Sequence, residues 1–438
     1  MDLEEVLEQL TTGEQRRIED DLDRLGVTPR VVLGRVVALA AGPAHARRDD
    51  PVGMAQQLLH DPRAASPEDR GLGSVGRGLS FQRSPLRPYR RRASAIYQRR
   101  MGFEPELRAG PPWVMEEMIW AQLDLPDQIL QREEAARLAS LLRAAVDAGE
   151  PLLFTGCGTS EHAARAAEAM VRDALPDAAV ASRDAFEAAL APPTRGLVVA
   201  ISHEAGTPAT LEAARGASEA GARAVLVTAQ PASAPAGLET IGTPLHDRSW
   251  CHTVAYLSPM LLHAALAGLN PERARELITA QLDARPQRQE QAARLAGCRR
   301  LLAVGSGVDE ITAAELALKL EEAIHVPTTP LGAEKVLHGH LPAADRDTGL
   351  VLLRFDPDHR DERDRRSADV AAAASVLDMP TVELAAPDAV TRAEALLAGA
   401  VALQVLTLEL CLALGTNPDL IRREQPLYRQ VAEAGGAG

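Results

Sequence analysis

The sequence PLLFTGCGTS at residues 151–160 decides the fold class, because it joins a short apolar run to a turn of small residues. With the Ala-rich segment EHAARAAEAMVRDAL at 161–175, it is typical of a buried parallel strand that leads into a helix. The pattern recurs in GLVVAISHEAGT at 196–207 and PATLEAARGASEAG at 208–221, and ARAVLVTA at 222–229 predicts a third strand. These segments predict a βαβαβ unit with a parallel sheet covered by helices on both faces.

The same order of segments returns further along the chain. The segments of this second unit are RRLLAVGSGVDE (299–310), ITAAELALKLEEAI (311–324), DTGLVLLRFDPD (347–358), a predicted helix at 363–377 and PTVELAA (380–386). The first strands of the two units begin near Leu152 and Leu301, which are 149 residues apart. The second strands begin near Gly196 and Gly349, which are 153 residues apart. Two offsets that agree this closely indicate an internal duplication.

Composition limits the kinds of partner that the chain can have. Its 438 residues suit two or three domains, with 46% apolar residues but only 3% aromatics. A net charge of -14 repels a nucleic-acid backbone, so a small molecule is the expected ligand. We expect no apolar run that approaches the ~20 residues needed to cross a bilayer, and the charged N-terminus MDLEEVLEQL lacks a signal-peptide core. The sequence therefore predicts a cytoplasmic protein without a membrane partner.

Four segments are expected along the chain. Residues 1–42 show helical periodicity, and residues 43–112, rich in Pro, Gly and Arg, predict an arm or linker. Residues 113–285 and 286–438 contain the two α/β units, and we predict one doubly wound domain in each. The arginines between 83 and 100 predict a basic arm that lies on the acidic body of this or a partner subunit, with phosphate or nucleic-acid binding as the alternative.

Small and hydroxyl-bearing residues gather where the first two strands of the first unit end. Ligands of open parallel sheets bind at this edge, where turn amides and helix N-termini favour anions. Ser and Thr are also ordinary helix N-caps, so the prediction of a ligand cradle depends on two such turns occurring together. The candidate binding residues are Gly156, Cys157, Gly158, Thr159, Ser160, Ser202, His203, Glu204, Gly206 and Thr207.

Lysine is rare in this chain. Of its 47 basic residues only Lys319 and Lys335 are lysines, so arginine supplies the positive charge elsewhere. A lysine that persists against this bias is a candidate for chemistry that requires a compact ammonium with an adjustable pKa. The alternative is the chance survival of two lysines within one 17-residue stretch.

The paired turns resemble those of a known family. GCGTS with its Ala-rich helix, followed by ISHEAGTPATL, resembles the two phosphate loops of sugar isomerase (SIS) domains. The double arrangement is similar to the isomerase half of glucosamine-6-phosphate synthase, without the glutaminase domain, and WVMEEMIWAQLDLP at 113–126 approximates that family's leading helix. The resemblance covers residues 113 to about 430. It implies two tandem SIS domains, a homodimer, and no cofactor or metal.

The second unit has the most specific match. ALKLEEAI and VLHGHL resemble the family's ALKLKE and ELKHGP segments, and this resemblance implies that Lys319, Glu322 and His338 are the catalytic Lys, Glu and His. Lys319 and Glu322 also share one helix face, where a carboxylate can remove the proton beside a sugar carbonyl while an ammonium stabilises the enediolate. His338 suits ring opening. The alternatives are a surface ion pair that includes Glu315, and a metal-ligand pair at His338 and His340 that lacks an evident third ligand.

Three further positions bear on the ligand. Glu204 and Gly206 stand where the family has Ser and Glu, and a carboxylate beside a phosphate costs on the order of 1 kcal/mol. The ligand is therefore an amino sugar, an unphosphorylated sugar, or a phosphate held differently. His252 falls where the family has a Ser-Thr-Lys segment and is predicted to line the pocket. The C-terminal tail at 417–431 contains no lysine, which excludes imine formation with a keto sugar from that position.

Together these features predict an aldose-ketose isomerase for a sugar or sugar phosphate. Glu322 is expected to move the proton, Lys319 to stabilise charge and His338 to open the ring. Two alternatives stay open, an amino-sugar deaminase or deglycase and a sugar-binding regulatory protein without turnover. The intact Lys-Glu-His set favours an enzyme, because a pure sensor has no need to retain it.

Overall fold

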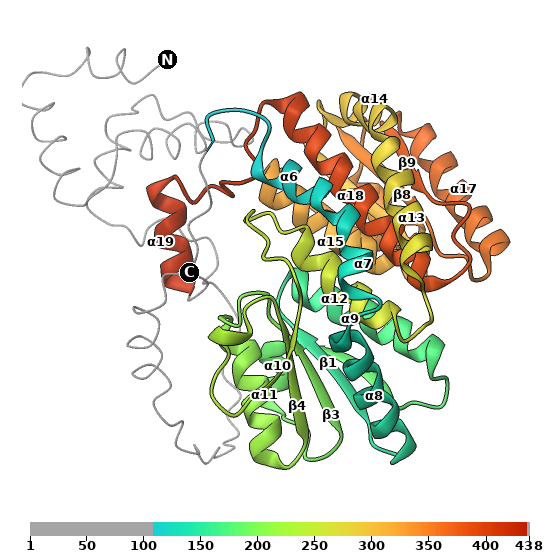
Figure 1. Ribbon diagram of the computed structural model, residues 1–438. Helices are drawn as coiled ribbons and strands as arrows, with labels where there is room; N and C mark the ends of the chain where they lie inside the picture. The colour runs from blue at the N-terminus through green and yellow to red at the C-terminus, as the bar shows by residue number, and fades with distance from the viewer. Residues whose placement is uncertain (1–107, 436–438) are drawn as a thin grey trace, which may run out of the picture. The chain divides into compact units, whose positions relative to one another are not determined.

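The computed structural model describes residues 108–435, in which two parallel β-sheets are flanked by helices (Figure 1). The α/β fold with two doubly wound sheets is therefore confirmed. The predicted helical element at 1–42 and almost all of the predicted arm at 43–112 lie outside the described residues.

The first sheet has five parallel strands in the order β2-β1-β3-β4-β5. Its central strands β1 (Leu152–Gly156) and β3 (Leu197–Ile201) are fully buried, and Leu152 of β1 is the register partner of both Val180 and Leu197. The remaining strands are β2 (Val180–Asp184), β4 (Arg223–Thr228) and β5 (Glu239–Gly242). The edge strands β2 and β5 were not predicted, because both are only partly buried and lack a continuous apolar run.

Helices precede and cover this sheet. Four helical segments lead into it, and three more follow its strands. They are α6 (Val114–Ala121), η2 (Gln122–Asp124), α7 (Leu125–Ile129), α8 (Glu133–Asp147), α9 (Thr159–Ala174), α10 (Ala185–Leu190) and α11 (Pro208–Ala220). After β5 come α12 (Val254–Ala264), α13 (Pro271–Asp283) and α14 (Arg285–Leu295), with the short η3 (Pro231–Ser233) before β5.

The second sheet repeats this topology with four parallel strands in the order β7-β6-β8-β9. Its strands are β6 (Arg300–Gly305), β7 (Thr328–Gly332), β8 (Thr348–Arg354) and β9 (Thr381–Ala385). Its helices are α15 (Asp309–Ala323), α16 (Ala333–Lys335), η4 (Val336–His340), η5 (Leu341–Ala343), α17 (Arg360–Val376), α18 (Arg392–Leu414) and α19 (Pro426–Gly435). The predicted helix at 363–377 corresponds to α17, and β7 is a strand that the sequence did not predict.

Gly156 and Gly305 allow the same close approach of a helix to a strand in the two units. A Cβ added at Gly156 would lie 2.6 Å from the backbone of Ser160, and one added at Gly305 would lie 2.5 Å from Asp309. Each following helix therefore begins directly against the end of its strand, an approach that only glycine allows. The duplication inferred from spacing is thus also visible in this matched backbone constraint.

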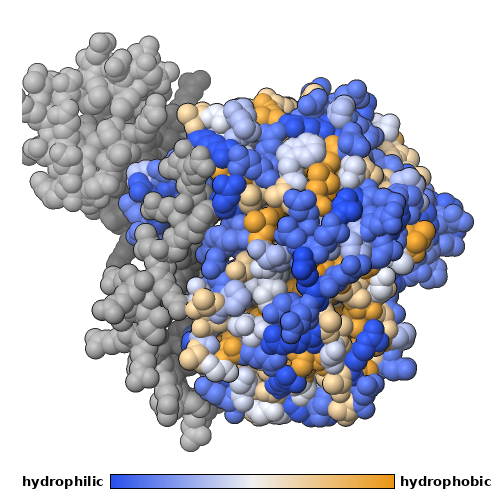
Figure 2. All heavy atoms as spheres, in the orientation of Figure 1, coloured by the Kyte–Doolittle hydropathy of each residue, from blue (hydrophilic) through white to orange (hydrophobic). Residues whose placement is uncertain are grey.

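The sequence-based expectation that no apolar run approaches a membrane-spanning length is wrong for α18. This helix has 23 residues with a hydropathy of 2.0, but 94% of the apolar window is buried inside the protein. A helix that is apolar all round belongs in the centre of a large core. Helices α9, α14 and α15 pack against it, and one core runs through both units, while the visible surface is mostly hydrophilic with scattered apolar spots (Figures 1 and 2).

Candidate functional site

The first sheet brings both predicted loops to one place. Strand order reverses between β1 and β3, and open α/β sheets bind ligands at the carboxyl edge of such a point. The turns 156–160 and 202–207 follow these two paired strands, and the Thr210 hydroxyl at the start of α11 donates to Cys157 Sγ at 3.7 Å. The left-handed conformation of Gly158, at φ 55°, directs the chain into α9.

Part of the hydrogen-bonding capacity of these loops is satisfied internally. The Ser202 hydroxyl donates to Thr207 Oγ1 at 3.3 Å and accepts from the Thr207 amide at 3.5 Å. Burial raises the pKa of the Cys157 thiol, and the nearby Asp184 carboxylate raises it further. The cradle therefore offers hydroxyls and a neutral thiol.

A row of charged side chains runs along one face of α15. Lys319 Nζ lies 2.6 Å from Glu322 Oε2 and 3.7 Å from Glu315 Oε1. The Lys319 and Glu315 side chains are fully buried, whereas that of Glu322 is 25% exposed. Burial alone would lower the pKa of Lys319, but the charges of Glu322 and Glu315 outweigh burial and raise it above its ordinary value. Lys319 is thus a permanent cation, and Glu322 is the member of the row that a ligand can reach.

Glu315 joins this row to the first unit. Its carboxylate accepts the Thr159 hydroxyl at 3.1 Å and lies 2.7 Å from His162 Nδ1. Thr159 is one of the predicted loop residues, and His162 lies in the first turn of α9. The predicted binding loop and the predicted Lys-Glu pair therefore meet at one buried carboxylate.

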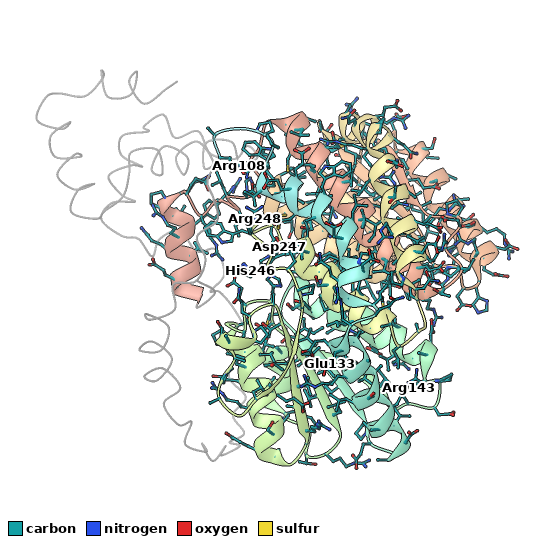
Figure 3. All side chains as sticks on the ribbon, in the orientation of Figure 1. Arg108, Glu133, Arg143, His246, Asp247 and Arg248 are labelled. Atoms are coloured by element: carbon teal, nitrogen blue, oxygen red, sulfur yellow. The ribbon has the colours of Figure 1, made fainter. Side chains whose placement is uncertain are left out.

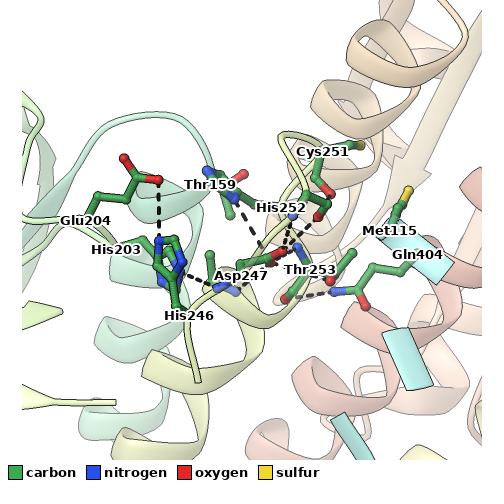
Figure 4. Close-up of polar contacts among 12 residues, drawn as sticks. Met115, Thr159, His203, Glu204, His246, Asp247, Cys251, His252, Thr253 and Gln404 are labelled. Carbon is green, nitrogen blue, oxygen red and sulfur yellow. Dashed lines mark hydrogen bonds and ion pairs between the residues drawn. The ribbon is translucent and has the colours of Figure 1, made fainter. Parts of the chain in front are cut away.

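A hooked segment after β5 forms a third wall, and Asp247 holds it in shape (Figure 4). The buried Asp247 carboxylate accepts the backbone amides of Ser249, Thr253 and Ala255 at 2.6–3.0 Å. It also accepts the Ser249 hydroxyl at 2.7 Å. Burial by itself raises the pKa of Asp247, but His252, His203 and these hydrogen bonds lower it overall, so the carboxylate is ionised.

Three histidines gather on this hook. The ring of His203 stacks on His246 with centroids 5.1 Å apart and lies 5.6 Å from the ring of His252. The Asp247 amide donates to His203 Nε2 at 2.7 Å, which places the proton of the neutral ring on Nδ1. Burial, followed by the charge of His252, lowers the pKa of His203 to about 3. His203 is therefore a neutral wall of the site rather than an acid.

Glu204 and the hook carry charge at the edge of the loops. Glu204 Oε1 lies 3.5 Å from His246 Nε2, and this contact lowers the pKa of Glu204. Arg248, next to Asp247 in Figure 3, donates to Glu117 at 2.8 Å, and Arg108 pairs with the same carboxylate. The hook is thereby attached to α6, whose first two amides the Asp419 carboxylate caps at 2.6 and 2.8 Å.

Residues 250–252 bring the hook to the α15 row. Cys251 Sγ lies 3.9 Å from the Lys319 carbonyl oxygen, and the Arg423 guanidinium lies 4.5 Å from the centre of the Trp250 ring. His252 Nδ1 is buried without a hydrogen-bond partner, 4.0 Å from Asp247 Oδ2. The hook therefore places the predicted His252 between the first-unit loops and the helix that carries Lys319.

His338 is separate from this group. It lies in η4, its side chain is 70% exposed, and its Nε2 contacts Glu334 Oε1 at 2.6 Å. Within residues 108–435, the structure does not bring His338 into contact with Lys319 or Glu322. The other predicted residues lie on segments that contact one another: the Gly156–Ser160 and Ser202–Thr207 turns, the hook that carries His252, and the helix of the Lys319–Glu322 pair. Their role as one binding site stays a prediction.

The corresponding turns of the second unit contain acids in place of hydroxyls. Asp356 Oδ2 accepts the Val308 amide at 2.9 Å, and Asp309 Oδ2 accepts the amides of Phe355 and Asp356. Burial raises the pKa of Asp309 to about 7. In the second unit, an internal carboxylate therefore accepts the backbone amide of the turn. A ligand is expected to use the corresponding turn of the first unit.

Sequence reasoning missed His162, His246 and Asp247, and gave Glu315 only as the partner in an alternative ion pair. The contact between His162 and Glu315 spans 153 residues, so no local pattern reveals it. Asp247 sits in an irregular segment without periodicity. Its one visible signal is the sequence DRSWCHT, which places an acid before two hydroxyl residues that can cap or turn.

Comparisons with known proteins concern the fold. No protein-family model matches the sequence, and no curated protein matches it significantly. Among solved structures, tagatose-6-phosphate ketose/aldose isomerase from Escherichia coli is 17% identical with a TM-score of 0.60, over 73% of this chain and 98% of that one. The C-terminal domain of glucosamine-fructose-6-phosphate aminotransferase from Francisella tularensis is 17% identical with a TM-score of 0.59, over 72% and 99%.

A third protein with the same fold is a deaminase rather than an isomerase. Glucosamine-6-phosphate deaminase from Thermotoga maritima is 17% identical with a TM-score of 0.51, over 69% of this chain and 96% of that one. These likenesses confirm the predicted fold of two SIS-type sheets.

Proposed function

We propose that this chain is a sugar-processing enzyme, an aldose-ketose isomerase that moves a proton between neighbouring carbons of a sugar or amino sugar. The observation that carries the proposal is the Lys319–Glu322 pair, whose ammonium is buried between two carboxylates beside the first-unit loops. The fold shared with a ketose/aldose isomerase supports the same chemistry.

Glu322 is the proposed base, because its carboxylate is the exposed end of the row. It takes the proton from C2 of an open-chain aldose, the electrons of the C2–H bond form the C1=C2 bond, and the carbonyl oxygen becomes an enediolate oxygen. A proton moves from O2 to O1, and Glu322 returns its own proton to C1, which yields the ketose. Lys319 holds the Glu322 carboxylate at 2.6 Å and supplies a fixed positive charge while the enediolate is negative.

The loops of the first unit are the proposed binding residues for the distal end of the sugar. Ser160 and Thr207 contribute hydroxyls at two helix starts, and Gly156 and Gly158 let the backbone approach the ligand. His252 is proposed to contact the sugar between these loops and Glu322.

Ring opening is assigned to His338, with the histidine supplied by a second copy of the chain. The side chain is 70% exposed, and a homodimer in which His338 of the partner subunit reaches this site follows the family resemblance. His252 is the matched comparison, because it lies in the site of its own subunit. In a homodimeric enzyme, His338→Asn should slow turnover of cyclic substrate about 10²-fold or more. His252→Asn should chiefly raise KM.

Hydrogen exchange tests the proposed base directly. Free and phosphorylated hexoses and hexosamines are incubated with the protein in D₂O, and NMR measures solvent deuterium at C1 or C2. Glu322→Gln should abolish the exchange while keeping ligand binding, whereas Glu310→Gln, which alters a surface pair on the same helix, should retain it. Unchanged exchange in Glu322→Gln contradicts the assignment, and ligand binding without exchange in the parent protein would favour the regulatory alternative.

One observation favours a second candidate function, an amino-sugar deaminase. The ionised Glu204 carboxylate at the edge of the loops suits an amine rather than a phosphate. The fold is shared with a glucosamine-6-phosphate deaminase, which supports this candidate. Release of ammonia from a hexosamine, measured alongside deuterium uptake, separates deamination from isomerisation.

A further inference from the structure

A second cavity, of about 290 Å³, opens between the two units on the side of the second sheet. It lies where strand order reverses between β6 and β8, because Val308 follows β6 and Asp356 follows β8. This is the position in the second unit that corresponds to the candidate site in the first, and open sheets bind ligands there. Residues of α9 form the opposite wall, just as α15 does in the first site.

Two of the three arginines that line the cavity are already paired. Arg172 donates to Glu168 and to the Val180 carbonyl oxygen. Arg392, at the start of α18, contacts Asp173 and Asp358 at 2.6 Å each. These contacts fix both guanidinium groups in the wall and neutralise most of their charge.

Arg165 differs from them. It is half-buried in the cavity wall, and within residues 108–435 it makes no ion pair or hydrogen bond. The other charged groups of the lining have partners, since Arg172 pairs with Glu168, Arg392 with two carboxylates and Asp356 with Arg363. Arg165 is thus the lining guanidinium without a carboxylate of its own in the described part of the chain. An unpaired guanidinium in a cavity wall favours an anion as the ligand.

The lining groups of the cavity differ in whether their hydrogen-bonding atoms are available to a ligand. The Asp356 carboxylate accepts the amides of Val308 and Asp358 at 2.9 and 3.0 Å and lies 3.5 Å from the Arg363 guanidinium. Asp356 is thereby balanced by local donors, and the amide turn is closed to an external ligand. The donors of the Arg165 guanidinium, in contrast, have no partner within residues 108–435 and are available to a ligand.

We propose that this cavity binds a small oxyanion, a carboxylate or phosphate group, through Arg165. A guanidinium presents parallel N–H groups that match two oxygens of either group. The cavity is at the lower end of the size range for ligand pockets, so the ligand is a small metabolite. The site is separate from the proposed sugar site, from which it differs in charge.

Isothermal titration of the full chain at low ionic strength, with inorganic phosphate and separately with acetate, tests the proposal. We expect saturable binding of at least one anion, and the stronger of the two identifies the preferred group. Arg165→Gln should weaken binding at least five-fold. Glu168→Gln should tighten it, because this change removes a carboxylate and releases Arg172. Arg215→Gln, the same change at an exposed arginine of α11, should leave it unaltered.

Each outcome has a defined meaning. The absence of saturable binding by either anion in the parent protein overturns the proposal. An anion that binds equally well to the parent and Arg165→Gln proteins also overturns it, because its site then lies elsewhere, for example at the first-unit loops. Equal weakening in the Arg165→Gln and Arg215→Gln proteins does so too, because it would reflect the net charge of the chain rather than the cavity.

Discussion

The Nδ1 atom of His162 lies 2.7 Å from Oε2 of Glu315, and the two residues belong to different units of the duplicated fold. The same carboxylate accepts the Thr159 hydroxyl and lies 3.7 Å from Lys319 Nζ. A single buried carboxylate thus connects the ligand loop of one unit to the cation of the other.

Removal of this carboxylate should be costly. Glu315→Ala leaves Lys319 with one counter-charge and leaves Thr159 and His162 without their partner. We expect the free energy of unfolding to fall by about 3–5 kcal/mol, the range for breaking a buried ion pair. Urea denaturation measures it, with Glu310→Ala as the control, because the exposed pair with Lys335 is worth about 0–1 kcal/mol. Equal losses in the two variants would show that Glu315 does not connect the units.

His203 should make the protein less stable in acid. Its pKa is about 3 in the folded protein, against 6.5 ordinarily, so the unfolded chain binds a proton that the folded protein does not. The contribution of His203 to the free energy of unfolding is complete above pH 6.5 and decreases as the pH falls toward 3. About 3 kcal/mol of it is lost at pH 4.

The variant His203→Gln isolates this effect, because its amide oxygen can still accept the Asp247 amide. Denaturation at pH 7 and pH 4 measures the unfolding free energy of both proteins. Between these pH values, the parent should lose about 3 kcal/mol relative to the variant. His263, buried with a pKa of about 4, acts in the same direction in both proteins and cancels. An identical pH dependence in both proteins would mean that His203 is protonated in the fold.

Asp309 should have the opposite effect. Its folded pKa of about 7 exceeds the ordinary 3.8, so the unfolded chain loses this proton first and stability decreases as the pH rises between these values. Asp309→Asn removes the ionisation and keeps an acceptor for the amides of Phe355 and Asp356. We expect the variant to be more stable than the parent by about 2–4 kcal/mol at pH 8, with little difference at pH 4. Thermal unfolding at both pH values measures this, and a variant less stable at pH 8 contradicts it.

Glu204 should disfavour phosphorylated substrates. If the proposed function holds, Glu204→Gln removes a negative charge beside the distal end of the sugar. The ratio of kcat/KM for a phosphorylated over the matching free sugar should then rise about five-fold, which corresponds to about 1 kcal/mol. Glu219→Gln, an exposed position on α11, is the control. A ratio that is unchanged in Glu204→Gln would mean that a phosphate group on the sugar does not lie beside this loop.

The sequence predicts the central strands of both sheets, because each is a short apolar run that ends in a turn. It does not predict β2, β5 and β7, which lie at sheet edges, are only partly buried, and have polar sequences such as VASRD and TTPLG. Helix α18 was overlooked for the opposite reason. Burial on every side removes the amphipathic period by which a helix is recognised.

For the site, local spacing was informative only within one helix. The contact between Lys319 and Glu322 follows from three-residue spacing and is present at 2.6 Å, while their catalytic role stays a prediction. Contacts made by tertiary packing, such as those of His162 and Asp247, have no signature in the neighbouring sequence. His338 lies in η4 beside Glu334, and its approach to the site from a second copy of the chain stays a proposal.

The continuous core has a consequence for dividing the chain. Helix α14 precedes β6 in sequence but packs on α18, and α9 of the first unit packs on both α15 and α18. A cut near residue 297, between the two sheets, would leave each fragment with an uncovered apolar face whose complement is on the other fragment. Fragments expressed together would reassociate, whereas either one alone would aggregate.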